Sequence, residues 1–166
     1  MKADVLIRRA TLADLEAITG IYNEAILTTT ATFDTEPKTL AERTEWFQSH
    51  DDRHPVLVAV VGQEVVGWSA INRWSDRPAY NDTAETSFYV KAGHRGQGIG
   101  KTLKAATIEE ARRLKFHTLI ARIAQDNPVS MHLNESAGFV HVGVMREVGK
   151  KFGKLLNVHI LQKMLM

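Results

Sequence analysis

Ten residues near the middle of the chain, Gly93–Thr102, combine four glycines with the cations Arg95 and Lys101. Glycine-rich turns let a backbone approach an anion closely, and the free N–H groups at the start of a following helix favour negative charge. The segment therefore predicts a site for a phosphate or pyrophosphate group. The ordinary alternative is a solvated turn between a strand and a helix.

Two nucleotide-binding motifs fit this segment only in part. The Walker A motif ends as Gly100-Lys101-Thr102 does, but its first glycine would fall at residue 95, which is arginine. The dinucleotide motif G-x-G-x-x-G matches Gly96 and Gly98 and then meets Lys101 where it requires glycine. What remains is an anion site made by the backbone of residues 96–101 at the start of a helix.

The flanking segments predict the elements that position this loop. Residues 83–90 alternate between two faces, with Ala84, Thr86, Phe88 and Val90 on one of them, which is typical of a strand. Residues 101–114 carry an apolar stripe at helical spacing. The glycine loop is therefore expected to join the end of a strand to the start of a helix.

The same patterns predict a single α/β domain over residues 1–166, with a mixed, mostly antiparallel sheet of about six to seven strands and about four helices. The predicted strands cover residues 5–10, 55–61, 64–74, 83–90, 118–123, 139–148 and 155–165. The predicted helices cover residues 12–26, 40–50, 101–114 and 127–138. A basic loop over residues 149–154 is expected between the last two strands.

Composition excludes several functional classes. The formal net charge of +2 disfavours a broad nucleic-acid surface, and the lack of cysteine excludes disulfides, thiolate metal ligands and a cysteine nucleophile. The longest apolar run, Val56–Val61, is too short to cross a membrane, and the opening residues lack a secretory signal. The seven histidines show no metal-ligand spacing. We expect a cytoplasmic protein without a metal, nucleic-acid partner or membrane partner.

Two motifs in this order resemble the GCN5-related N-acetyltransferases (GNAT). The first is Arg95-x-x-Gly98-x-Gly100, and the second begins at Asn127 and ends at Gly138-Phe139. The resemblance implies the GNAT fold with splayed central strands, and acetyl-CoA as cosubstrate with its pyrophosphate on the glycine loop. The cofactor-binding residues that it implies are Phe88, Tyr89, Val90, Arg95, Gly96, Gln97, Gly98, Ile99, Gly100, Lys101, Asn127 and Ser136.

Two further segments, "RPAYNDTAETSFYV" and "VGKKFGK", resemble the phosphinothricin and methionine sulfoximine acetyltransferases within that superfamily. This resemblance implies a small amino-acid-like acceptor that is acetylated on its α-amine. It also implies a homodimer in which residues 149–154 lie near the interface. A different small amine remains open as the acceptor, because related sequences acetylate other compounds.

The resemblance assigns roles to residues of the predicted strand at 83–90. Glu85 is the expected general base, acting through a water, because an amine attacks a thioester only when it is unprotonated. A backbone N–H between Phe88 and Val90 is expected to stabilise the oxyanion. Relatives carry a tyrosine as general acid where this chain has Asn134, which is a poor acid. Two alternatives stay open: the sulfur leaves directly as a thiolate, or Tyr89 substitutes as the proton donor.

The acceptor site is expected just upstream and on the same strand. Arg73 and Arg77 are candidates for binding the acceptor's carboxylate, since arginine forms paired hydrogen bonds with carboxylates. Phe33 and Trp74 are expected to wall the side-chain pocket, and the set of substrate-binding candidates is completed by Thr86 and Ser87. Two other functions stay open: an acyl-CoA-binding sensor without catalysis and, less favoured by the motifs, a nucleotide hydrolase.

Overall fold

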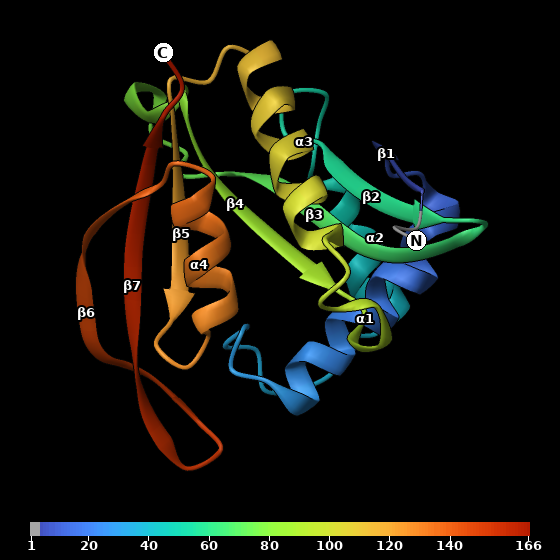
Figure 1. Ribbon diagram of the computed structural model, residues 1–166, viewed down its shortest axis with the longest axis horizontal. Helices are drawn as coiled ribbons and strands as arrows, with labels where there is room; N and C mark the ends of the chain where they lie inside the picture. Colours follow the sequence, from blue (N-terminus) through green and yellow to red (C-terminus); the bar gives the residue numbers. More distant parts are fainter. Residues whose placement is uncertain (1–3) are drawn as a thin grey trace.

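A computed structural model describes residues 4–166 of the chain, and in it one sheet of seven strands is flanked by four α-helices (Figure 1). The strands are β1 (Val5–Arg9), β2 (Val56–Val61), β3 (Glu64–Arg73), β4 (Thr83–Val90), β5 (Thr118–Ala124), β6 (Val140–Lys151) and β7 (Lys154–Met164). The helices are α1 (Leu15–Thr28), α2 (Leu40–Gln48), α3 (Ile99–Arg113) and α4 (Pro128–Ser136). The predicted fold class is confirmed.

The sheet has the order β1-β2-β3-β4-β5-β7-β6, and its neighbours are antiparallel except for β4 and β5. These two parallel strands pair only where Thr83–Glu85 faces Thr118–Ile120. Beyond Glu85 they run apart, as Figure 1 shows, while β4 stays paired with β3 as far as Val90. The expected splay between the central strands is therefore present.

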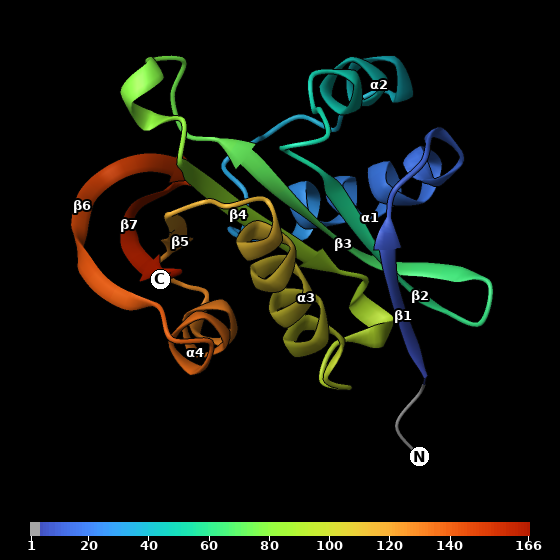
Figure 2. The same ribbon diagram turned by 90° about the horizontal axis from the view of Figure 1, so that it is seen from above.

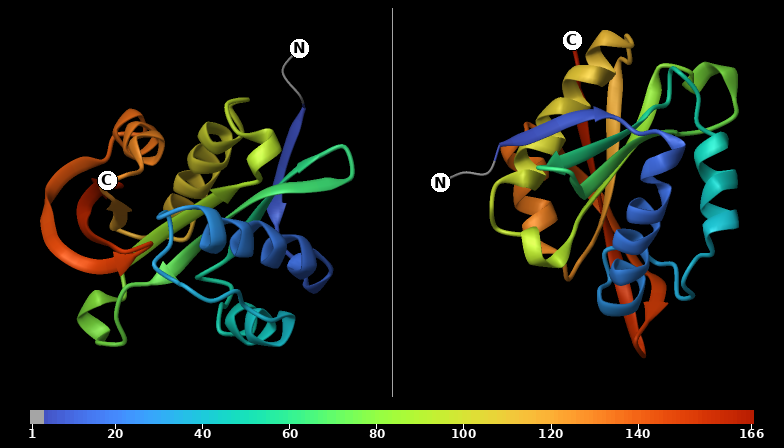
Figure 3. Two further views of the ribbon diagram at one scale, coloured as in Figure 1. Left: turned by 90° about the horizontal axis from the view of Figure 1, so that it is seen from below. Right: turned by 90° about the vertical axis from the view of Figure 1, so that its right-hand side faces the viewer.

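The helices cover both faces of the sheet. Figures 2 and 3 show α1 and α2 on one face and α3 and α4 on the other. On the first face Ile18 and Tyr22 of α1 pack with Trp68 of β3, and on the second Leu103 of α3 packs with Val66. The two cores hold β3 and β4 rigidly between helices, so the strand that carries Glu85 has a fixed position.

Helix α3 begins at Ile99, two residues before the predicted start. Gly98 is its N-terminal cap and adopts the left-handed conformation, with φ of 82°, and Gly96 has φ of 76°. Other residues are strained in this conformation, so the turn from β4 into α3 depends on these glycines. Helix α4 begins as predicted, with Asn127 as its cap: the Asn127 Oδ1 accepts a hydrogen bond of 3.1 Å from the N–H of Ser130.

The prediction of a loop over residues 149–154 is wrong. Strand β6 continues to Lys151 and β7 begins at Lys154, so only Phe152 and Gly153 form the turn. Both have positive φ, 52° and 74°, which is the geometry of a tight two-residue hairpin. The hairpin tip lies beside the segment that follows α1 (Figure 3), and the Lys151 Nζ donates a hydrogen bond of 2.8 Å to the carbonyl of Thr32.

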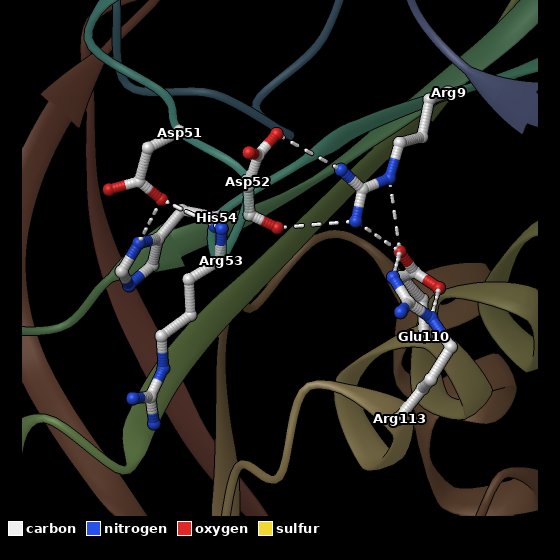
Figure 4. A network of polar contacts seen from close by, with 7 residues as sticks. All are labelled: Arg9, Asp51, Asp52, Arg53, His54, Glu110 and Arg113. Carbon is white, nitrogen blue, oxygen red and sulfur yellow. Dashed lines mark hydrogen bonds and ion pairs between the residues drawn. The ribbon is translucent and has the colours of Figure 1, made fainter.

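A network of ion pairs fastens β1 and the α2–β2 loop to α3 (Figure 4). The Arg9 Nη2 lies 2.7 Å from the Glu110 Oε1, and Arg9 also contacts Asp52. Hydrogen bonds from Arg113 and Arg9 lower the pKa of Glu110 to about 2. These residues do not line the pockets described below, so the network supports the fold.

Candidate active site

The parting of β4 from β5 opens two connected pockets. We call the first, of about 660 Å³, the donor groove; it follows the glycine loop and the start of α3. We call the second, of about 550 Å³, the acceptor pocket; it contains Glu85. Six residues line both: Thr30, Ala31, Phe88, Tyr89, Asn127 and Ser130. Ligands in the two spaces would therefore meet beside Phe88 and Tyr89.

The backbone of β4 presents hydrogen-bonding groups to this junction. The N–H of Lys91 donates to Val66 of β3 at 2.8 Å, whereas the carbonyl of Val90 accepts from the Arg95 Nε at 3.0 Å on the other side. Successive residues of a strand point their N–H groups in opposite directions. The N–H of Tyr89, two residues before Lys91, is therefore also directed toward β3. The N–H groups of Phe88 and Val90 are directed into the gap that β5 leaves, so these two are the candidates for stabilising an oxyanion.

The donor groove brings together most of the predicted cofactor-binding residues. The predicted residues that line it are Phe88, Tyr89, Val90, Arg95, Gly96, Gly98, Gly100, Lys101 and Asn127. The Arg95 Nη2 also lies 3.5 Å from the Glu24 Oε1, which holds the guanidinium at the mouth of the groove. Two formal positive charges and the first turn of α3 therefore surround the space.

Three predicted cofactor-binding residues do not line the groove. Ile99 is 1% exposed and belongs to the core with Leu103, so its side chain cannot touch a ligand. Gln97 is exposed on the outer side of the loop, and the hydroxyl of Ser136 lies 3.4 Å from the His132 ring on the exposed side of α4. Helical spacing puts Ser136 and Ser130 on different sides of α4, and Ser130 is the one on the side that faces the groove.

Glu85 lies at the last pair of β4 with β5, at the base of the gap. Its carboxylate forms two hydrogen bonds with the guanidinium of Arg122 on β5, one through Arg122 Nη2 to Glu85 Oε1 at 2.9 Å and one from Arg122 Nε. These bonds raise the pKa of Arg122. The Glu85 side chain is 17% exposed. Glu85 is thus held in one orientation and is still reachable from the acceptor pocket.

The acceptor pocket contains three of the predicted substrate-binding residues, Phe33, Thr86 and Ser87. The hydroxyl of Thr86 accepts a hydrogen bond from the Lys104 Nζ at 2.9 Å, and that of Ser87 accepts one from the Asn72 Nδ2 at 3.1 Å. Both hydroxyls are therefore already oriented by neighbouring side chains.

The other three substrate-binding candidates lie outside the pocket lining. Arg73 is 3.6 Å from Asp51 and 3.9 Å from Asp76, and Arg77 is on the exposed loop after β3. Trp74 lies next to Arg122, with the guanidinium carbon 5.8 Å from the ring centre. Arg73 pairs with Ala84, the residue before Glu85, but neither its side chain nor those of Trp74 and Arg77 line the acceptor pocket.

Several residues of the site were missed from the sequence. Arg122 is a cation in the otherwise apolar segment "TLIARI", which is the signal that could have marked it. Asn72 and Ser130 carry no such signal. Arg43 carries no such signal either, yet it is buried and lines the acceptor pocket.

Asn134 is the residue that the sequence places at the expected position of a general acid. Its side chain is buried, and its Nδ2 donates to the carbonyl of Ser130 at 2.8 Å. An amide is not an acid, and Tyr89 is the one phenolic hydroxyl among the residues that line both pockets. Burial raises the pKa of Tyr89. Its ring also packs on Tyr22 and Trp68, so it has a structural role as well.

Comparison with protein families decides the class. The family model described as "Acetyltransferase (GNAT) family" matches residues 18–139, which include the glycine loop and Glu85. The chain belongs to the GNAT acetyltransferase family. The predicted enzyme class, an N-acetyltransferase, is thereby confirmed at the level of the family, and the alternative of a sensor without catalysis is not favoured.

Curated relatives have nearly the same length as this GNAT chain. It is 38% identical over 160 residues to a phosphinothricin N-acetyltransferase of Streptomyces coelicolor, covering 94% of both chains. It is also 38% identical over 158 residues to an L-methionine sulfoximine/L-methionine sulfone acetyltransferase of Pseudomonas aeruginosa, covering 94% of this chain and 92% of the relative.

A solved structure shows the same fold with a ligand. A phosphinothricin acetyltransferase from Sinorhizobium meliloti in complex with acetyl-CoA is 32% identical and superimposes with a TM-score of 0.94, covering 99% of this chain and 89% of that one.

Two negative findings concern residues 4–166: no helix there has the length and apolar character to cross a membrane, and no three His, Asp or Glu side chains there could hold a metal ion.

Proposed function

We propose that this protein transfers an acetyl group from acetyl-CoA to the α-amine of a small amino-acid-like acceptor, such as phosphinothricin or methionine sulfoximine. The observation that carries the proposal is the position of Glu85 in the acceptor pocket, on the strand whose free N–H groups face the donor groove. The names of the relatives support the choice of acceptor.

The residues divide the work of a direct transfer. Glu85 accepts the proton of the amine through a water, and the unprotonated nitrogen then bonds to the thioester carbon. The N–H groups of Phe88 and Val90 stabilise the oxyanion of the tetrahedral intermediate. When the carbon–sulfur bond breaks, the sulfur leaves as a thiolate or takes a proton from Tyr89. A free thiol has a pKa of about 8.5, so departure as a thiolate is feasible near neutral pH.

The proposal includes a homodimer that acts in the cytoplasm as a single catalytic domain, without a metal or nucleic acid. Support for the dimer comes from β6, an edge strand of the sheet. It carries exposed apolar side chains that a partner would cover: Val140, Val142 and Val144.

The test of the proposal is thiol release from acetyl-CoA in the presence of candidate acceptors. Wild-type protein should release thiol only when an acceptor such as phosphinothricin is added. Glu85→Gln should lower kcat by about 10²- to 10⁴-fold, as expected for loss of a general base, while calorimetry shows unchanged CoA binding. A Glu85→Gln variant with wild-type kcat would remove Glu85 from the mechanism. CoA binding without turnover over a broad amine panel would instead indicate a sensor.

A further inference from the structure

A buried cation lies at one end of the acceptor pocket. Arg43 of α2 lines the pocket and is only 5% exposed. Its guanidinium carbon lies 3.7 Å from the ring centre of Trp46, 4.4 Å from that of Tyr22 and 5.2 Å from that of Trp68. The aromatic rings therefore hold the guanidinium in place through cation–π contacts.

This end of the pocket has hydrogen-bond donors without acceptors. The Arg43 Nε and Nη2 are fully buried and have no hydrogen-bond partner among residues 4–166. Trp68 also lines the pocket, and its indole Nε1 is likewise fully buried without a hydrogen-bond partner among these residues. The carboxylate of Asp34 is nearby, but it accepts a hydrogen bond from the hydroxyl of Tyr22. Unpartnered buried donors are costly, and a ligand oxygen would satisfy them.

The charge of Arg43 persists at neutral pH. Burial lowers the pKa of Arg43 to about 10, and the side chain therefore stays protonated. Among residues 4–166, Glu85 is the only carboxylate that lines the acceptor pocket, and it is paired with Arg122. The pocket thus offers one cation that its own side chains do not neutralise by a close ion pair.

The register of the sheet separates this cation from the base. Glu85 lies opposite Asn72, whereas Trp68 lies opposite Tyr89, four residues along β4. Four strand residues span about 13 Å. The reacting α-amine and the α-carboxylate beside it must lie in the gap between β4 and β5, where the N–H groups of Phe88 and Val90 hold the thioester carbonyl and Glu85 is reached through a water. The end of the acceptor's side chain is the part that extends toward Arg43.

We propose that Arg43 and Trp68 bind an oxygen-bearing group at the end of the acceptor's side chain. The class comprises amino acids whose side chain ends in a phosphinate, sulfone, sulfoximine or carboxylate. This inference rests on the proposed function and specifies its acceptor. Apolar amino acids of the same length lack the oxygen, so they would leave the three donors unpaired and be poor substrates.

The test compares two acceptors that differ in the terminal oxygens, methionine sulfone and norleucine. Arg43→Met removes the donors and keeps most of the side-chain volume. It should lower kcat/KM for methionine sulfone by about 10- to 100-fold, the range for loss of charge-assisted hydrogen bonds, and change kcat/KM for norleucine by less than about threefold. Arg112→Met, on the exposed side of α3, is the matched control and should leave both values unchanged.

Equal losses for the two acceptors, or no loss for either, would overturn the inference. If Arg43→Met does not fold, Arg43→Lys and Trp68→Phe remove fewer donors and should each reduce the preference for methionine sulfone over norleucine. The proposed function fails separately, if wild-type protein releases no thiol with any amine. Calorimetric binding of methionine sulfone to wild-type protein and to Arg43→Met then decides the inference: weaker binding to the variant supports it, and equal or absent binding overturns it.

Discussion

At the residue scale, a second buried cation has a different environment from Arg43. Lys104 of α3 is 2% exposed, and its Nζ contacts the hydroxyl of Thr86 and lies 4.2 Å from the ring centre of Phe139. No carboxylate among residues 4–166 forms an ion pair with it. Burial lowers the pKa of Lys104 to about 7. Lys104 therefore makes the stability of the fold depend on pH in the neutral range.

The direction of this dependence follows from proton binding. Above pH 7 the unfolded chain keeps a proton on residue 104 that the folded protein releases, so the free energy of unfolding rises with pH, by at most about 1.4 kcal/mol per pH unit. Lys104→Met should remove this rise and be more stable than wild type at pH 6. Urea unfolding between pH 6 and pH 9 measures the free energy of unfolding at each pH, and the exposed Lys154→Met is the control. Parallel pH profiles of Lys104→Met and wild type would show that Lys104 stays charged when folded.

The sequence predicts the residues of the site unevenly, and the reason is physical. Glu85 and the glycine loop follow from strand alternation and from local backbone requirements, which are properties of neighbouring residues. Arg122 and Arg43 come to the pocket from β5 and α2, through the order of strands and the packing of helices. Local patterns do not contain that information. Arg73 and Arg77 show the converse, because they are near Glu85 in sequence and still do not line the pocket.

At the scale of elements, the β6–β7 hairpin closes the acceptor pocket. Gly149 of β6 lies against the ring of Phe33, and a Cβ added at Gly149 would overlap the Phe33 Cε2. Phe33 belongs to the segment after α1, and Lys151 fixes the same segment through Thr32. Hairpin and segment therefore depend on each other, and only glycine at residue 149 lets the two approach this closely.

Gly149→Ala should push the Phe33 ring out of its position. Because Phe33 lines the acceptor pocket and not the donor groove, KM for the acceptor should rise several-fold while CoA binding stays unchanged. Steady-state kinetics and calorimetry measure the two effects. Gly143→Ala is the control on the same strand, since nothing lies within 4 Å of its added Cβ. Equal acceptor KM values in the two variants would show that the position of Phe33 does not matter.

At the scale of the whole molecule, two halves of the sheet meet at β4 and β5. One half comprises β1 to β4 and the other β5, β7 and β6, and three residue pairs join them across this boundary. The open part of the boundary is where the donor is proposed to bind. Binding there should affect backbone groups of both halves without changing the fold.

Hydrogen exchange can detect this effect. We expect the amides of Phe88 and Val90, which face the gap, to exchange faster than that of Tyr89 in the free protein. Saturation with CoA should slow Phe88 and Val90 more than Tyr89, and at 100 times its Kd should add about 2.7 kcal/mol to the free energy of unfolding. A uniform slowing of all three amides would indicate global stabilisation without contact at β4.

The V formed by β4 and β5 has the geometry of a lever whose pivot would be the pair Glu85–Ile120. When the two arms of such a lever open, displacement grows with distance from the pivot. The glycine loop, beyond the far end of β4, would move most and give a bulky donor room to enter. Glu85, at the pivot, would move least. Opening of the cleft is thus compatible with a base that keeps its position through every turnover.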